Sequence, residues 1–155
     1  MKNVLRYIFL TQVIIFSSLG CKNNTTIIMP VSPSSNIILF DKEPEVIQSN
    51  IQGDWKLEYS LGGFVGIKQK PSQTFIYTFK PNSLTLSIDG KMETPMSYSW
   101  LKEKYSDTSN GYTYLMDFKS NYTPKLFFHS IVNDTLQFSQ YNTVEGFTFW
   151  LSRIK

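Results

Sequence analysis

Apolar and polar residues alternate with a period of two through most of the chain after Gly53, and this alternation constrains the fold more than any other feature. Such a period places every second side chain on one face of a β-strand. The alternating segments are residues 55–59, 73–79, 84–88, 94–101, 112–118, 125–131, 135–141 and 147–154. Segments of helical period long enough to cross between parallel strands do not separate them. The pattern therefore predicts an all-β fold of about eight antiparallel strands.

Short turn sequences join several of these strands. Pro81-Asn82, Asp89-Gly90 and Asn133-Asp134 favour tight turns, which connect antiparallel neighbours. An up-and-down meander with one apolar face closes most economically into a barrel, because closure removes exposed sheet edges. We therefore expect a barrel of about eight strands, with a two-sheet β-sandwich as the alternative. Residues 61–72 and 102–111 are expected to be long loops.

The first 20 residues have the layout of a secretory signal peptide. Lys2 and Arg6 precede an apolar run, and Gly20 is a small residue of the kind that precedes a cleavage site. The apolar run is about a dozen residues, shorter than the roughly 20 that a helix needs to cross a bilayer. A permanent transmembrane helix is therefore the weaker interpretation.

Cys21 is the one cysteine of the chain and cannot form an internal disulfide. Residues 18–21, Ser-Leu-Gly-Cys, resemble the lipobox of bacterial lipoproteins, which implies that Cys21 is lipidated and becomes the mature N-terminus. Two acyl chains would give stable membrane attachment, and a chance cysteine near an ordinary cleavage site is the alternative. Residues 21–50 are then a tether and a short N-terminal segment, with a strand at 37–40 and a helical turn at 43–50.

The charge distribution argues against a nucleic-acid partner. Loss of residues 1–20 removes Lys2 and Arg6 and leaves 13 basic against 12 acidic residues. The remaining basic residues are dispersed rather than clustered. The interpretation that follows is an exported protein held in the cell envelope, at the outer membrane and facing the periplasm, with surface exposure left open.

Gly53, Trp55 and Arg153 carry a resemblance to a known family. In a meander the first and last strands become neighbours, so Arg153 can lie over the indole of Trp55 in a cation–π contact. Gly53-x-Trp55 at the start of the first strand, with Arg153 near the end of the last, resembles the lipocalin and wider calycin signature. Residues 51–155 resemble, in particular, small lipocalin-like lipoproteins of Gram-negative envelopes. The resemblance implies a barrel whose closed end is formed by these three residues.

Catalytic and metal sites lack the residues that they need. His129 is the single histidine, and its strand position predicts a solvated outward side chain rather than a catalytic one. Asp54 and Glu58 fall on the outer face, opposite Trp55 and Leu57. Too few His and Cys residues remain for a zinc site. We expect no enzymatic activity, no cofactor and no metal.

The predicted inner face is rich in aromatic side chains. The residues expected to touch a ligand are Tyr59, Tyr77, Met96, Tyr98, Trp100, Tyr114, Met116 and Phe128. They are either a packed core or the lining of a pocket for a small hydrophobic ligand. In a third interpretation, the interior is filled and the loops at 61–72 and 102–111 bind another envelope protein.

Overall fold

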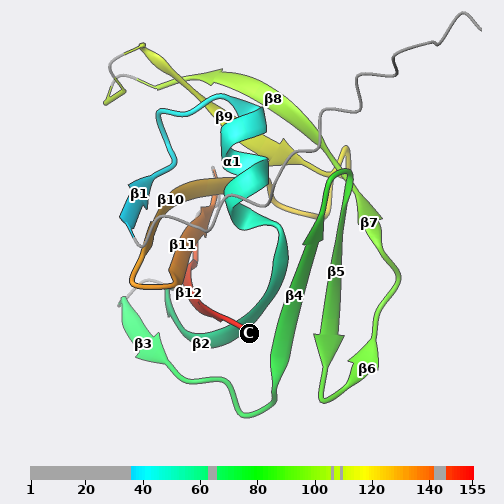
Figure 1. Ribbon diagram of the computed structural model, residues 1–155. Helices are drawn as coiled ribbons and strands as arrows, with labels where there is room; N and C mark the ends of the chain where they lie inside the picture. Colours follow the sequence, from blue (N-terminus) through cyan, green and yellow to red (C-terminus); the bar gives the residue numbers. More distant parts are fainter. Residues whose placement is uncertain (1–35, 63–65, 106, 109, 142–145) are drawn as a thin grey trace, which may run out of the picture.

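A computed structural model describes residues 36–62, 66–105, 107–108, 110–141 and 146–155 (Figure 1). Strands dominate the described residues, which confirms the all-β prediction. The strands are β1 (Asn36–Ile38), β2 (Gly53–Gly62), β3 (Ile67–Gln69), β4 (Phe75–Lys80), β5 (Ser83–Ile88), β6 (Lys91–Met92), β7 (Met96–Ser97), β8 (Ser99–Lys104), β9 (Tyr112–Asp117), β10 (Leu126–Val132), β11 (Thr135–Gln140) and β12 (Thr148–Arg153). The one helix among these residues is α1 (Pro44–Ile51).

The strands form one antiparallel sheet in the order β6-β5-β4-β2-β12-β11-β10-β9-β8. In addition, β1 pairs with β10, β3 with β2, and β7 with β5. The hydrogen-bonded order has two ends, at β6 and β8, so the closed eight-stranded barrel is not confirmed. The chain exchanges partners at Tyr98, because β7 pairs with β5 whereas β8 pairs with β9.

The first and last long strands are neighbours, as the meander predicts. Strand β2 pairs with β12, and Trp55 lies opposite Arg153. Two-residue turns close three hairpins: Pro81-Asn82 joins β4 to β5, Asp89-Gly90 joins β5 to β6, and Asn133-Asp134 joins β10 to β11. Both residues of the last two turns have positive φ. Positive φ at both central positions matches the twist of the flanking strands.

The two segments expected to be long loops contain more strand than the sequence suggests. Strand β2 continues to Gly62 and the chain returns as β3, with Ser60 opposite Gln69. Strand β8 likewise continues to Lys104, opposite Tyr112. In both places the alternation weakens but backbone pairing persists, because each strand still has a neighbour that satisfies its N–H and C=O groups.

The N-terminal segment folds against the sheet. Pro44 occupies the first turn of α1, where its missing N–H costs nothing. Ile47 and Ile51, four residues apart on one helix face, are fully buried. Strand β1 pairs with β10 through Ile37 and Ile131. A short strand and a helix are thereby present as predicted, at Asn36–Ile38 rather than 37–40 and at Pro44–Ile51 rather than 43–50.

The core contains residues from α1 and from strands near the beginning and the end of the described chain. Its largest fully buried side chains include Trp55, Phe79, Phe128 and Phe138. No helix among the described residues is long and apolar enough to cross a membrane. The predicted signal peptide, Cys21 and the tether lie outside the described residues.

Candidate functional site

Gly53, Trp55 and Arg153 meet where the sheet contacts α1. The guanidinium carbon of Arg153 lies 4.1 Å from the centroid of the Trp55 ring, so the expected cation–π contact is present. Trp55 is fully buried. Gly53 has a φ of +109°, a conformation that residues with a Cβ rarely adopt. The glycine is therefore required by the backbone rather than by crowding.

Arg153 and Trp55 also donate hydrogen bonds to the last carbonyl groups of α1 and to the carbonyl of Gln52, the residue after it. Arg153 donates from its two terminal nitrogens to the carbonyls of Asn50 at 2.7 Å and Gln52 at 3.0 Å. The Trp55 indole donates to the Ile51 carbonyl at 2.7 Å. Helix carbonyls at a C-terminus lack intrahelical partners and interact favourably with cations. Burial lowers the pKa of Arg153, whose charge these carbonyls stabilise.

Met116 and Phe128, two of the predicted ligand contacts, are fully buried in the core. The ring of Phe128 lies 5.9 Å from that of Phe79 and 5.6 Å from that of Phe138. Such centroid distances are those of packed aromatic pairs. These side chains therefore fill the interior next to α1.

Tyr98, Trp100 and Tyr114 use their polar atoms within the fold. The Tyr98 hydroxyl donates to the Lys80 carbonyl at 2.8 Å, and the Trp100 indole donates to Gln48 at 3.4 Å. A hydrogen bond to Glu43 is the main cause that raises the pKa of Tyr114 to about 12. The Tyr98 bond ties the β7–β8 junction to the last residue of β4, and the other two bonds tie β8 and β9 to α1 and its N-cap residue.

Tyr77 differs from these residues because its hydroxyl has no hydrogen bond to any described residue. Its ring packs edge-on against Phe138, with centroids 5.8 Å apart. Burial raises the pKa of Tyr77 to about 12. Phe75 and Phe149 are half-buried on the same inner face, and Met96 is half-buried against the core. Tyr77 therefore offers one free polar group within an apolar surface.

Tyr59 does not share the inner face, so that prediction is wrong. Pairing with β12 shifts between Leu57 and Tyr59, which leaves Glu58 as the extra residue of a β-bulge. A bulge reverses the alternation, and Tyr59 therefore stacks on Trp150, with ring centroids 4.7 Å apart. Lys68 covers the same tyrosine, with its ammonium 3.7 Å from the ring centroid.

His129 also lies at a bulge, between Phe128 and Ser130. It is half-buried rather than solvated, because its Nε2 lies 2.8 Å from the Ser139 hydroxyl and its ring packs edge-on against Phe127. Burial lowers its pKa. Asp54 and Glu58 lie on the outer face as predicted, where they accept hydrogen bonds from Thr78 and Ser152 respectively.

An open hollow of about 240 Å³ on the outer face was not predicted from the sequence. It forms where β2 leaves β4 and pairs with β3 instead. The residues that line it are Lys56, Leu57, Glu58, Lys70, Pro71, Ser72, Gln73 and Thr74. The β2 bulge lines one side and the β3–β4 connection lines the other, and alternation carries no signal for either.

Among the residues that the structure describes, no group of three or more His, Cys, Asp or Glu side chains is placed to hold a metal ion. Comparison with known proteins gave no family model, no curated protein and no solved structure that matches the chain.

Proposed function

We propose that this is an exported, lipid-anchored protein of the cell envelope that binds a small apolar ligand at the end of its sheet away from α1. The observation that carries the proposal is a gradient of exposure along the inner face. Phe79 and Leu151 are fully buried near α1, whereas Phe75 and Phe149, further along the same strands and face, are half-buried. A half-open apolar surface beside a sealed core is a typical small-molecule site.

The partner exchange at Tyr98 supports a barrel-like arrangement. Residues 91–97 follow β5 through β6 and β7, and β8 then follows β9. The segment from Lys91 to Lys104 can therefore be regarded as one bent strand between β5 and β9. Together with β2, β4, β5, β9, β10, β11 and β12 it would make the barrel that the lipocalin resemblance implies.

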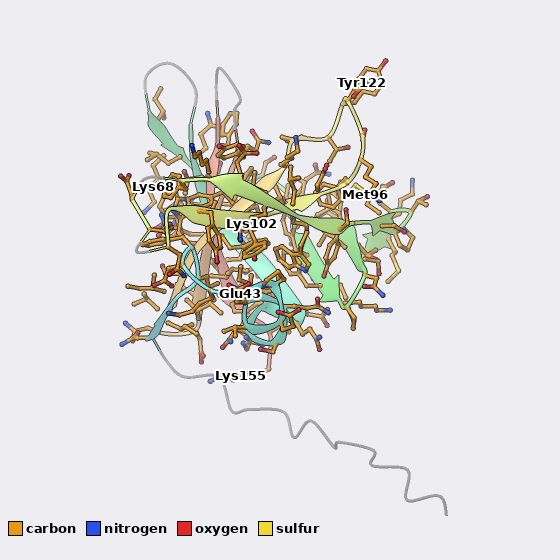
Figure 2. The ribbon with its side chains drawn as sticks, turned by 90° about the horizontal axis from the view of Figure 1, so that it is seen from above. Glu43, Lys68, Met96, Lys102, Tyr122 and Lys155 are labelled. Carbon is orange, nitrogen blue, oxygen red and sulfur yellow. The ribbon has the colours of Figure 1, made fainter. Side chains whose placement is uncertain are left out.

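The open end is opposite α1. In an antiparallel sheet, successive connections alternate between the two ends of the sheet. By this alternation, the β9–β10 connection lies at the same end of the sheet as the start of β4. Figure 2 shows Tyr122, in that connection, far from Glu43 and Lys155. Phe75 and Phe149 lie toward this end, and the Tyr77 hydroxyl is the polar group available to orient a ligand.

The ligand that fits this surface is small, flat and apolar, with one hydrogen-bonding group. Phe138 and Phe149 approach each other at 5.2 Å between centroids, so ring contacts already fill the space below. Binding would therefore be shallow, against the faces of Phe75 and Phe149. Aromatic surfaces of this kind bind aromatic or acyl groups through area and ring stacking.

The test is a titration of the purified protein with N-phenyl-1-naphthylamine, whose fluorescence rises in apolar sites. We expect saturable binding of one probe per chain, which Phe149→Ser weakens about tenfold by removing an aromatic contact surface. Tyr122→Ser is the matched control, because the Tyr122 side chain is 98% exposed and therefore packs against neither Phe75 nor Phe149. Equal binding by Phe149→Ser, with native circular dichroism, would overturn the proposal.

The anchor is tested separately. Cys21→Ala should move the protein from the carbonate-washed membrane fraction to the soluble fraction. Retention in the membrane would contradict lipidation but would leave ligand binding untouched.

A second candidate function is a protein-interaction module with a filled interior. The contacts of Phe128 with Phe79 and Phe138 favour it, since they occupy the interior with side chains. In that case the probe titration gives no saturable signal, and cross-linking in the envelope recovers a partner that shortening residues 61–72 or 102–111 abolishes.

A further inference from the structure

Strand β8 is an open edge of the sheet. It ends the hydrogen-bonded order, and among the described residues it pairs with β9 alone. Figure 1 shows β8 at the margin of the molecule, with β9 on its inner side. Open edges bind additional strands readily.

The edge is open because the neighbouring β4–β5 hairpin ends at its turn before it reaches β8. The Tyr98 amide donates to the Asn82 carbonyl at 3.2 Å, within the turn that precedes β5. No residue of β5 lies beyond this point, since that strand begins at Ser83. From Ser99 onward, β8 therefore has no strand on its second side among the described residues.

The pairing pattern identifies the backbone groups at this edge. In an antiparallel pair, alternate residues direct both backbone groups toward the partner strand. The Tyr105 amide donates to the Gly111 carbonyl, so odd-numbered residues here face β9. Trp100, Lys102 and Lys104 therefore direct their N–H and C=O groups toward the open side.

On the face of β8 that carries Trp100, Lys102 and Lys104, the side chains are basic and aromatic, whereas Glu103 lies on the opposite face. The Lys102 ammonium lies 3.4 Å from the centroid of the Tyr112 ring and 5.9 Å from that of Tyr114. Lys104 is exposed on the same face, two residues along. Neither lysine forms an ion pair with any residue that the structure describes. Two positive charges therefore lie at one side of an open strand.

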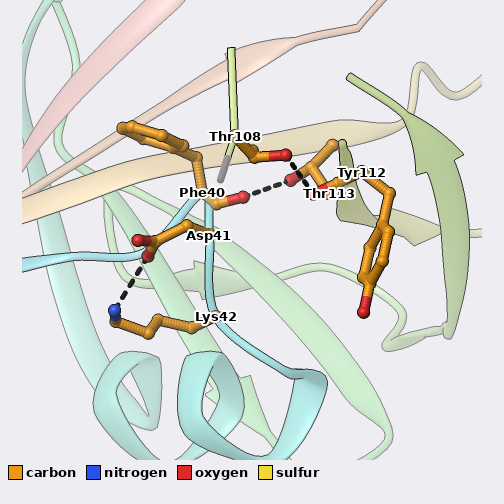
Figure 3. A network of polar contacts seen from close by, with 6 residues as sticks. All are labelled: Phe40, Asp41, Lys42, Thr108, Tyr112 and Thr113. Atoms are coloured by element: carbon orange, nitrogen blue, oxygen red, sulfur yellow. Dashed lines mark hydrogen bonds and ion pairs between the residues drawn. The ribbon is translucent and has the colours of Figure 1, made fainter. Parts of the chain in front are cut away.

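The β8–β9 hairpin, which carries this edge, is hydrogen-bonded to the segment that precedes α1. Figure 3 shows the Thr113 hydroxyl donating to the Phe40 carbonyl at 2.8 Å and Thr108 lying 2.8 Å from the Tyr112 carbonyl. The first bond fixes β9 to the segment that precedes α1, and the second holds the turn residue Thr108 against the start of β9. An ordered edge binds a strand with a smaller entropic cost than a mobile one.

We propose that the β8 edge binds an extended acidic segment of a partner protein, which adds to the sheet as a further strand. Backbone hydrogen bonds to Trp100, Lys102 and Lys104 would supply affinity, and carboxylates opposite the two lysines would select the segment. Edge lysines commonly prevent strands from pairing with copies of themselves. The same charges that repel a basic strand attract an acidic one. The other edges are less suited, since β6 has two residues and β3 has three.

The experiment measures binding of fluorescent eight-residue peptides to the full chain by fluorescence polarisation. One peptide alternates valine and glutamate, and its matched control alternates valine and lysine. We expect the acidic peptide alone to bind, and the combined variant Lys102→Glu/Lys104→Glu to weaken binding about tenfold through charge reversal. Lys91→Glu on β6 is the control for reversing a charge elsewhere on the sheet, compared with Lys102→Glu alone, and should change binding less than about twofold.

Lys102→Pro tests strand addition itself when it is compared with Lys102→Ala, which removes the same charge but keeps the backbone N–H. The proline removes an N–H directed at the open side but leaves the β9 pairing intact, as edge prolines do. We expect it to abolish binding while the circular dichroism stays native. Hydrogen exchange should show new protection of the Trp100, Lys102 and Lys104 amides when the acidic peptide is bound.

Two outcomes would overturn the proposal. Equal binding of the acidic and basic peptides, or unchanged binding by Lys102→Pro, would exclude charge-selected strand addition. Sedimentation that detects a dimer which Lys102→Pro dissociates would assign the edge to a second copy of this chain instead.

Discussion

At the scale of single residues, Gly62 shows how packing excludes a side chain. A Cβ at this position would lie 2.3–2.8 Å from three carbons of the Phe147 ring. Gly62→Ala should therefore lower the free energy of unfolding by about 1–3 kcal/mol, as overpacking does. Urea denaturation followed by circular dichroism measures the loss.

The control for Gly62 is a compensating change. In a Phe147→Leu background, the ring that blocks the methyl group is gone, so Gly62→Ala should cost less than it does alone. Equal costs in both backgrounds would show that the clash is not the cause.

His129 predicts a pH dependence of stability. Burial lowers its pKa in the folded protein, so the unfolded chain binds a proton first as the pH falls. Because the unfolded state then holds more protons, the free energy of unfolding decreases as the pH falls below about 6.5, the ordinary histidine value. His129→Gln, which can still reach Ser139, should reduce this slope. Identical thermal-unfolding profiles of the two proteins between pH 7 and 5 would contradict the prediction.

At the scale of elements, α1 contributes to stability through one face. Ile47 is fully buried, whereas the adjacent Val46 is 39% exposed. Ile47→Ala should lower the free energy of unfolding by about 2–5 kcal/mol through lost burial and a residual cavity. Val46→Ala, a matched truncation on the other face, should change it by about 0.5 kcal/mol. Similar losses in both variants would mean that the helix is not seated by this face.

Strands and turns were predictable from the sequence, and the two bulges were not. Alternation located most strands because one face of each must be buried, and Asn133-Asp134 marked its turn because both residues accept positive φ. The bulge residues Glu58 and His129 have no distinctive chemistry, because a bulge depends on how two twisted strands fit together. For that reason the alternation predicts the wrong face for Tyr59. The free hydroxyl of Tyr77 and the open edge of β8 depend on tertiary pairing, which alternation does not encode.

At the scale of the whole molecule, the three tryptophans report on different regions of the fold. Trp55 contacts Arg153 and α1, Trp100 bonds to Gln48, and Trp150 stacks on Tyr59 outside the sheet. Because one core joins α1 to strands near the beginning and the end of the described chain, we expect one cooperative unfolding transition. Variants that keep a single tryptophan should each show a fluorescence midpoint equal to their own far-UV circular dichroism midpoint. An earlier fluorescence midpoint for the variant that retains Trp100 would reveal independent loss of α1.

One turn touches both ends of the described fold. The Asn133 amide donates to the Asn36 side chain at 3.2 Å, and Asp134 forms an ion pair with Lys155 at 3.3 Å. The Arg153 amide also donates to the Asp134 carbonyl at 3.1 Å. Asn36 and Lys155 therefore lie at the same turn, and the strands could keep their places in the sheet if the chain were joined there and opened elsewhere. A short linker from Lys155 to Asn36, with new ends opened at Asp89-Gly90, would give a circular permutant that retains every pairing of the sheet.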